Sequence, residues 1–456
     1  MELPRRIFRE YDIRGVVGED LTADSYRALG AALAARFRDD GAAEAVVARD
    51  NRLHSPELHD ALVAGLRGAG MDVLSIGTVP TPVLYYALAE RGVGGDCGAV
   101  VTASHNPPQY NGLKIVSAGK ALSGADIAAL RDAALAPPLA AGGEGAYREE
   151  DWRGRYVARI AADVKLARPV RVVLDCANGT SGIVLRDLLA ALGVDAEILY
   201  EEPDGTFPNH PADPVVAENL ADLIARVREG GFELGIAFDG DSDRIGVVDG
   251  AGAILWGDRL LALYARDLLE KSPGAKVIFE VKCSRALAED IAAHGGTPVL
   301  WKTGHSLIKA KMREERALLA GEMSGHLFFA DRWFGFDDAL YAAARLLEIV
   351  ARDRRPLGEL LAGMPEYVST PEIRLPCPDE IKFEVVAALR DEFAAEHEVV
   401  DIDGVRVEFP DGWGLVRASN TGPVLVLRFE AETEARLEAI RSEVMAALDR
   451  HLPERA

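Results

Sequence analysis

The chain has 456 residues, of which 27% are charged and 49% hydrophobic, a composition typical of a globular protein with several domains. Its formal net charge of −22 argues against nucleic acid or an anionic membrane as partner, because both would be repelled. No apolar run approaches the roughly 20 residues of a membrane span, and the first residues lack an apolar signal core. The four cysteines form no CxxC pair. We therefore expect a cytoplasmic protein with reduced thiols and no zinc site.

The chain opens with a segment of mixed charge, Phe8–Gly15, which contains Tyr11 and Arg14. A surface turn is one interpretation of this segment. A guanidinium also matches the geometry of a phosphate group, so Arg14 is a candidate phosphate ligand.

A strand–helix–strand unit then appears three times. In each unit an apolar strand leads into a helix with a polar start or a glycine stop, and a second apolar strand follows. The predicted strand pairs are Ala45–Ala48 with Val73–Ile76, Val172–Leu174 with Ala196–Leu199, and Val277–Val281 with Val299–Trp301. Continuous apolar strands joined by helices indicate buried parallel sheet. We predict three similar α/β domains with mixed, largely parallel sheets.

Each unit continues into a further strand that ends in an unusual polar loop. Gly98–Val101 leads to Ser104, Gly235–Phe238 leads to Asp239–Arg244, and Ala317–Ala320 leads to Gly321–His326. Ligands of open α/β sheets bind beyond the carboxyl ends of the strands. We therefore expect the three loops to face one central cleft.

The last ninety or so residues follow a different pattern. The predicted elements are a helix at Glu380–Glu396, a strand at Val399–Val407 with a turn at Asp403-Gly404, strands at Leu415–Ala418 and Val424–Phe429, and a helix at Thr433–Leu452. Segments that suit domain ends are Ala136–Ala146, Asp249–Gly252 and Leu361–Pro365. We predict α/β domains at residues 1–150, 151–253 and 254–365, and an α+β domain at 366–456.

Ser104 sits where a buried strand gives way to a loop that two prolines prevent from becoming regular. His105 and Lys114 lie close to it in sequence and can handle charge. Because serine, asparagine and proline also favour turns, an ordinary turn remains the alternative.

The stretch Asp239–Arg244 places three carboxylates within five residues. Asp239, Asp241 and Asp243 would repel one another unless a cation joined them, and ligation by oxygen alone suits Mg²⁺. The stretch is not an EF-hand, because Gly250 stands where that loop needs a glutamate. A solvated acidic turn is the other alternative. Arg244 directly after the triplet can hold a phosphate close to the metal.

The third and fourth loops carry groups that suit a sugar and a second phosphate. Glu322 and Ser324 can accept and donate hydrogen bonds to sugar hydroxyls, and His326 is either a proton carrier or a structural histidine. Lys282 and His305 are weaker candidates, with solvated side chains as the alternative. The donors of the last domain, which could otherwise belong to a plain hairpin loop, are Arg417, Ser419, Asn420 and Thr421. The histidines interpreted as surface residues are His54, His59, His294, His397 and His451.

These stretches together resemble the motifs of the α-D-phosphohexomutases, in the same order and spacing and over nearly the whole chain. The motifs are Tyr11–Gly15, the Ser104 loop, Asp239–Arg244, Gly321–His326 and Arg417–Gly422. The sequence is most similar to the bacterial phosphomannomutase/phosphoglucomutase type. One departure is Ala48, where the family often has glycine.

The resemblance implies a four-domain, heart-shaped enzyme that moves a phosphoryl group reversibly between the 1- and 6-positions of mannose and glucose phosphates. It implies a phosphoserine, Mg²⁺, and a hexose 1,6-bisphosphate intermediate, with glucose 1,6-bisphosphate as activator. Hexose phosphates are the expected partners of a monomer, with a dimer as the alternative. The implied catalytic residues are Ser104, His105, Lys114, Arg244, His326 and Arg14. The implied substrate ligands are Tyr11, Lys282, His305, Glu322, Ser324, Arg417, Ser419, Asn420 and Thr421. The implied metal ligands are Ser104, Asp239, Asp241 and Asp243.

Three other functions remain as alternatives. A phosphoglucosamine mutase usually has glutamine directly before Ser324, where this chain has Met323, and glycine in place of Ser242. A non-catalytic sugar-phosphate-binding protein would need no nucleophile beside a metal site. A phosphoserine-based phosphatase would need no second phosphate clamp. The sequence contains neither a GxSxG elbow nor a P-loop, which leaves an α/β-hydrolase triad and a P-loop phosphate site unsupported.

Overall fold

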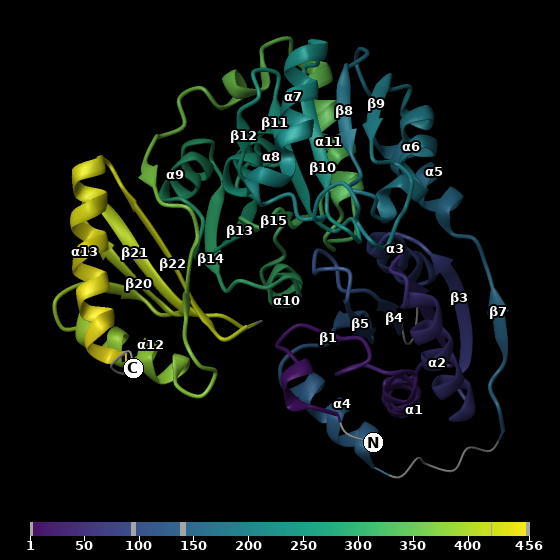
Figure 1. The fold of residues 1–456 in the computed structure, drawn as a ribbon. Helices are drawn as coiled ribbons and strands as arrows, with labels where there is room; N and C mark the ends of the chain where they lie inside the picture. The colour runs from purple at the N-terminus through teal and green to yellow at the C-terminus, as the bar shows by residue number, and fades with distance from the viewer. Residues whose placement is uncertain (1–2, 93–96, 137–142, 421, 453–456) are drawn as a thin grey trace.

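The computed structural model describes residues 3–92, 97–136, 143–420 and 422–452, which form four β-sheets with flanking helices (Figure 1). The first domain contains the largest sheet, in which β2 pairs in parallel with β3 and β4, and β4 pairs antiparallel with β5. Its elements are β1 (Ile13–Val16), α1 (Ala23–Asp39), β2 (Glu44–Arg49), α2 (Ser55–Gly68), β3 (Asp72–Thr78), α3 (Thr81–Arg91), β4 (Gly98–Val101), β5 (Tyr110–Ser117), β6 (Lys120–Ala121), α4 (Ala125–Leu135) and β7 (Tyr147–Glu149).

The second domain repeats this arrangement with the strand order β12-β11-β10-β8-β9. Here β8 lies between β9 and β10 and is parallel to both, and β10 is antiparallel to β11. Its elements are α5 (Arg153–Asp163), β8 (Val172–Asp175), the 3₁₀ turn Thr180–Ile183, α6 (Leu185–Leu192), β9 (Ala196–Leu199), the 3₁₀ turn Ala217–Leu220, α7 (Ala221–Gly230), β10 (Leu234–Phe238), β11 (Ile245–Asp249) and β12 (Ile254–Leu255).

The third domain has the order β14-β13-β15-β16, with β13 parallel to β14 and β15 and the last pair antiparallel. Its elements are α8 (Gly257–Lys271), β13 (Lys276–Glu280), α9 (Arg285–Ala293), β14 (Thr297–Trp301), α10 (His305–Glu315), β15 (Leu319–Gly321), β16 (Leu327–Phe329) and α11 (Ala339–Arg352). The three domains thus use one topology, as the repeated pattern predicts.

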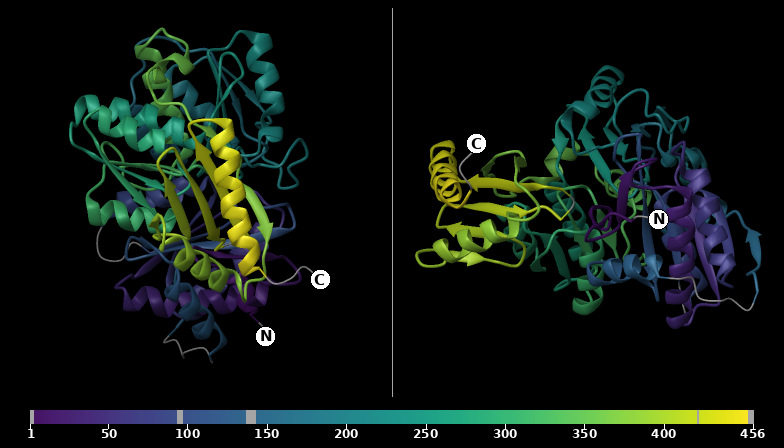
Figure 2. Two further views of the ribbon diagram at one scale, coloured as in Figure 1. Left: turned by 90° about the vertical axis from the view of Figure 1, so that its left-hand side faces the viewer. Right: turned by 60° about the horizontal axis from the view of Figure 1, so that its bottom comes forward.

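The fourth domain is an antiparallel sheet with two helices, α12 and α13 (Figure 2). Its elements are β17 (Val368–Ser369), β18 (Ile373–Pro376), α12 (Lys382–Phe393), β19 (Glu398–Val400), β20 (Val405–Phe409), β21 (Gly412–Ala418), β22 (Val424–Ala431) and α13 (Glu434–His451). It lies at one end of an arc of domains, with the tips of β21 and β22 directed toward the first domain (Figure 1).

Local signals place several helix ends. Thr22 and Ser25 form a capping box at the start of α1, and Ser284 caps α9 by accepting from the N–H of Ala286. Pro56 occupies the first turn of α2, where no N–H is needed. Helix α6 ends at Gly193, whose φ of 69° is left-handed and suits glycine.

Three expectations need correction. The strand expected at Val399–Val407 is two strands, β19 and β20, which pair antiparallel across the turn. The strand expected at Ala317–Ala320 begins at Leu319, because the N–H of Ala317 still bonds to the end of α10. His59 is buried, not on the surface, and its Nε2 lies 3.0 Å from the hydroxyl of Ser75. Of the expected linker Ala136–Ala146, residues 137–142 lie outside the described part of the chain.

One apolar core spans the first three domains, in addition to a smaller cluster within each, whereas the fourth has its own. The shared core runs from Val46 in the first domain through Tyr156 in the second to Met364 at the end of the third. The fourth domain encloses a separate cluster between its sheet and helices. All four cysteines are buried. No helix in the described ranges is long and apolar enough to cross a membrane.

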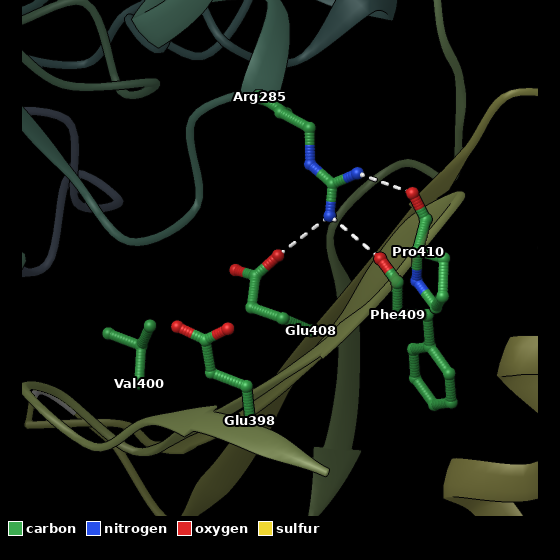
Figure 3. A pocket seen from close by; sticks show the side chains of 6 residues that line it. All are labelled: Arg285, Glu398, Val400, Glu408, Phe409 and Pro410. Atoms are coloured by element: carbon green, nitrogen blue, oxygen red, sulfur yellow. Dashed lines mark hydrogen bonds and ion pairs between the residues drawn. The ribbon is translucent and has the colours of Figure 1, made fainter.

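The third and fourth domains are joined by a polar contact around Arg285 at the start of α9. Its guanidinium donates to Glu408 at 2.8 Å and to the carbonyl oxygens of Phe409 and Pro410 (Figure 3). It also donates to the carbonyl oxygen of Gly412 at 2.9 Å. A cavity of about 550 Å³ lies beside this contact, and Glu398 and Val400 also line it. An apolar cluster of Val281, Trp413 and Leu415 also joins the two domains. Because the fourth domain has its own core, we predict that it can rotate as a unit about this junction.

Candidate active site

Ser104 lies in the segment 102–110, which leads from β4 into the first residue of β5 and which we call the serine loop. Only 1% of the surface of Ser104 is exposed. Its Oγ donates to Oδ2 of Asp239 at 2.5 Å and lies 3.1 Å from Nδ1 of His105. Its φ of 52° is left-handed, which is costly for serine. A Cβ on Gly240 would come within 2.4 Å of the Ser104 carbonyl oxygen, so glycine at 240 lets the loops of the first two domains interlock.

The loop Asp239–Arg244 follows β10 and buries its three aspartates completely. Lys114 on β5 donates to Asp241 Oδ2 at 2.6 Å and also to Asp243. Burial disfavours the Lys114 cation, but these two carboxylates outweigh burial and raise the pKa of its ammonium well above the ordinary value. Burial, followed by the charges of Asp243 and Asp241, raises the pKa of Asp239 well above its ordinary range. The carboxylate cluster is therefore only partly neutralised by Lys114.

The residues present fit a divalent cation bound by oxygen. One carboxylate oxygen each from Asp239, Asp241 and Asp243 lies within 4.8 Å of the others. Oδ1 of Asp241 and Oδ1 of Asp243 are buried and accept no hydrogen bond from any described residue. Buried, unpaired carboxylate oxygens are costly unless a cation binds them, and hard oxygen ligands favour a hard cation.

Arg244 connects the second domain to the third. Its Nε donates to Nε2 of His326 at 2.9 Å, which places the His326 proton on Nδ1, 3.2 Å from Oδ2 of Asp337. His305 stacks on His326 with 5.5 Å between ring centroids, and Lys309 donates to Asp337 at 2.8 Å. Burial, followed by the charge of Lys309, lowers the pKa of His305 well below its ordinary value. Both imidazoles are thus set beside one carboxylate.

Glu322 and Ser324 follow β15 as predicted. Glu322 is 2% exposed, and its Oε1 accepts the backbone N–H of Gly304 at 2.5 Å. Its Oε2 accepts the hydroxyl of Ser324, which is partly exposed, at 3.4 Å. Burial raises the pKa of Glu322. Lys282, after β13, pairs with Glu372 at 3.0 Å.

The fourth domain reaches this region through the loop between β21 and β22. Nδ2 of Asn420 donates to the hydroxyl of Tyr11 at 2.8 Å, and that hydroxyl donates to the Thr303 carbonyl oxygen at 2.6 Å. Tyr11 therefore joins the first, third and fourth domains. Arg417 on β21 is 5% exposed and pairs with Asp403 at 3.0 Å.

The structure brings the sequence-predicted residues together where these loops meet, a place that we call the central site. Arg14 also lies at the central site. Its guanidinium donates to Oδ1 of Asn106, in the serine loop, at 2.5 Å. Ser419 lies at the tip of β21, where its N–H donates to the Val424 carbonyl oxygen. Thr421 lies outside the described residues.

Three residues of the central site were missed from the sequence. Asp337 lies beside the two histidines, Lys309 donates to Asp337, and Arg52 bonds to the serine loop. The only signal for Arg52 was its place after a parallel strand, a position that Asn51 shares. Asp337 precedes the cap of α11, Asp338, and looks like a helix-start residue.

Comparison with known proteins identifies the family. Four domain families, described as phosphoglucomutase/phosphomannomutase α/β/α domains I, II and III and C-terminal domain, match residues 5–137, 154–252, 256–367 and 372–447. The chain is 50% identical over 455 residues to a phosphomannomutase/phosphoglucomutase of Pseudomonas aeruginosa, covering 99% of this chain and 98% of that one. It is 47% identical over 451 residues to a phosphoglucomutase of Neisseria gonorrhoeae, covering 98% and 97%.

A solved structure agrees over the full length. A phosphoglucomutase/phosphomannomutase family protein from Burkholderia thailandensis superposes with a TM-score of 0.93 at 47% identity, covering 100% of this chain and 99% of that one. The four domain families match the chain in order from residue 5 to residue 447, so the similarity does not depend on a single motif. The chain belongs to the phosphoglucomutase/phosphomannomutase family.

Proposed function

We propose that this protein is a phosphomannomutase/phosphoglucomutase, which moves a phosphoryl group reversibly between the 1- and 6-positions of mannose and glucose phosphates. The observation that carries the proposal is Ser104 Oγ, 2.5 Å from Asp239 and buried where loops of three domains meet. A serine hydroxyl beside a carboxylate cluster suits phosphoryl transfer, and the names of the relatives in Pseudomonas and Neisseria support this substrate class.

In the proposed reaction, phospho-Ser104 gives its phosphoryl group to the free hydroxyl of a hexose phosphate, and a hexose 1,6-bisphosphate forms. The P–O bond to Ser104 breaks as the bond to the sugar oxygen forms, and the proton of the sugar hydroxyl leaves to a base. The bisphosphate then reorients within the site, and its other phosphoryl group is transferred to Ser104. A Mg²⁺ ion held by Asp239, Asp241, Asp243 and Ser104 would offset negative charge on the transferring group.

The chain's own cations and histidines have matching roles in this proposal. Lys114 and Arg244 neutralise the transferring phosphoryl group, and Arg14 steadies the serine loop through Asn106. His326, held between Arg244 and Asp337, is the proposed proton carrier of the third domain, and His105 lies beside the nucleophile.

The sugar must be held in two orientations in turn. Glu322 and Ser324 can bind the 3- and 4-hydroxyls, which lie near the middle of the ring and stay in reach after reorientation. The far phosphate is then held by residues around the domain junction. These proposed ligands are Tyr11, Lys282, His305, Arg417, Ser419, Asn420 and Thr421.

Further features of the enzyme are proposals of the same kind. Glucose 1,6-bisphosphate would restore the phosphoserine when the intermediate escapes. The domain boundaries that we propose are 1–150, 151–253, 254–365 and 366–456. We expect a cytoplasmic monomer, with a dimer as the alternative.

The test compares Ser104→Ala with Ser117→Ala. Ser117 is an equally buried serine of the first domain whose hydroxyl donates to Asp40, away from the central site. Each protein is assayed with mannose, glucose and glucosamine 1-phosphates, and its intact mass is measured. We expect Ser104→Ala to lose both turnover and a phosphoryl mass that wild type and Ser117→Ala keep. Full turnover in Ser104→Ala would refute the proposal, and a preference for glucosamine 1-phosphate would favour the other subtype.

A further inference from the structure

Arg52, in the loop between β2 and α2, makes an unusually complete set of contacts. It is 1% exposed, and all five of its N–H groups donate hydrogen bonds. Nε donates to Asp50 at 3.1 Å. The other four N–H groups donate to backbone carbonyl oxygens of the serine loop, at 2.7 Å to Ser104, 2.5 Å to Asn106, 2.8 Å to Pro107 and 3.1 Å to Tyr110.

These bonds surround the strained residue of the loop. The left-handed backbone of Ser104 costs about 1 kcal/mol or more, and such conformations persist only when the surroundings hold them. The Ser104 carbonyl oxygen lies between the Arg52 guanidinium and Gly240, and the Ser104 N–H donates to the Thr102 hydroxyl at 3.0 Å. Arg52 also bonds to Asn106, two residues further on, so it holds the backbone on the carboxyl side of the nucleophile, and Thr102 holds the amino side.

Residues of the second domain also pack against Arg52. The Phe207 ring centroid lies 5.1 Å from the guanidinium carbon, within the range of a cation–π contact. A Cβ on Gly205 would come within 2.7 Å of the Arg52 Cα, so this loop packs directly on the arginine backbone. Arg52 is therefore enclosed by Asp50, the serine loop and the Phe207 segment.

We propose that Arg52 is a positioning residue for the phosphorylated serine. It keeps the serine loop in the left-handed conformation that holds Ser104 Oγ beside Asp239, and Phe207 of the second domain fixes Arg52 in place. Arg52 does not touch the reacting atoms in this structure. The inference rests on the proposed function, since it concerns the step that Ser104 performs.

Lysine in place of Arg52 separates charge from geometry. It keeps the positive charge but has three donors on one nitrogen, too few for four carbonyl oxygens. Small displacements of a reacting group lower turnover steeply, so we expect kcat of Arg52→Lys to fall by about 10- to 100-fold while KM changes little. Phe207→Leu should also lower kcat, by a smaller factor than Arg52→Lys.

The matched control is Arg345→Lys. Arg345 is also 1% exposed and fully enclosed, but it pairs with Asp331 and Asp267 away from the central site. Its replacement should lower the melting temperature and leave kcat unchanged. Arg52→Ala provides a second measurement, because methylguanidinium added to it should restore part of kcat, whereas the same concentration of tetramethylammonium should not.

The outcomes separate the two proposals. If wild type shows no mutase activity, the proposed function itself fails. If wild type is active but Arg52→Lys keeps its kcat, or if kcat falls in both lysine variants in proportion to their loss of melting temperature, the positioning role is wrong. Should Arg52→Ala not fold, the kcat of Arg52→Lys against Arg345→Lys still decides.

Discussion

Replacing Tyr11 by phenylalanine tests how the fourth domain is held against the rest of the protein. The Tyr11 hydroxyl accepts from Asn420 of the fourth domain and donates to Thr303 of the third. Phenylalanine keeps the ring, which is T-shaped to His305 with 6.0 Å between centroids, and removes only the hydroxyl. In the ligand-free protein the perturbation is therefore confined to the hydrogen bonds at the domain junction, and with substrate bound it also removes the proposed contact of Tyr11.

The size of the effect follows from one bond. A neutral hydrogen bond contributes about 1 kcal/mol net, and the Asn420 contact joins the fourth domain to the first. Its loss should lower the ratio of closed to open protein by about fivefold, because 1.4 kcal/mol corresponds to a factor of ten. If substrate binds to the closed form, KM rises by up to the same factor.

Steady-state kinetics and small-angle scattering of the ligand-free protein measure this change. Tyr11→Phe and Asn420→Ala should each raise KM and the radius of gyration, and the double variant should add little because both remove the same contact. Tyr264→Phe is the control, since it loses one buried bond to the Ala342 carbonyl oxygen inside the third domain. Unchanged KM and radius in both junction variants would show that this contact does not hold the domain.

Two further predictions concern metal binding and pH. Asp241→Asn should weaken Mg²⁺ binding measured by calorimetry by at least about tenfold, whereas Asp290→Asn on α9 should not; equal affinities would exclude Asp241 as a ligand. Burial disfavours the His210 cation, but its hydrogen bond with Asp175 outweighs burial and raises the pKa of His210. The pair therefore stabilises the fold below the unfolded pKa of about 6.5, and this stabilisation is lost as pH rises through the native pKa of His210. The melting temperature of wild type should therefore fall from about pH 6 to about pH 8, and a fall just as large in His210→Gln would contradict this assignment.

The parts of the molecule that were predictable from sequence are those whose signals are local. Continuous apolar strands and capped helices identified the repeated units, and the rule that ligands gather at strand ends placed Ser104, Asp239 and Glu322 at one site. The turn at Asp403-Gly404 was also visible. The apolar residues on both sides of it were nevertheless predicted as one strand.

The residues that were missed act through partners far away in the chain. Arg52 bonds to carbonyl oxygens 52 to 58 positions further on, and backbone oxygens leave no mark in a sequence. Asp337 bonds to Lys309 and lies beside His326, but its own neighbourhood resembles an ordinary helix start. Such roles depend on tertiary contacts and become visible only when the sheets are packed.

A chain with a net charge of −22 can still hold anionic phosphates, because its acidic residues position the cations of the central site. Arg14 pairs with Asp12 at 2.7 Å, Lys114 with Asp241, Lys282 with Glu372, and Arg417 with Asp403. Surface charges more than about 8 Å away are largely screened at physiological salt, so the distant acidic surface contributes little there. The paired carboxylates hold each donor in place before substrate arrives, which lowers the entropy lost when a phosphate binds. Recognition then depends on fixed N–H groups, and the overall charge of the protein does not oppose it.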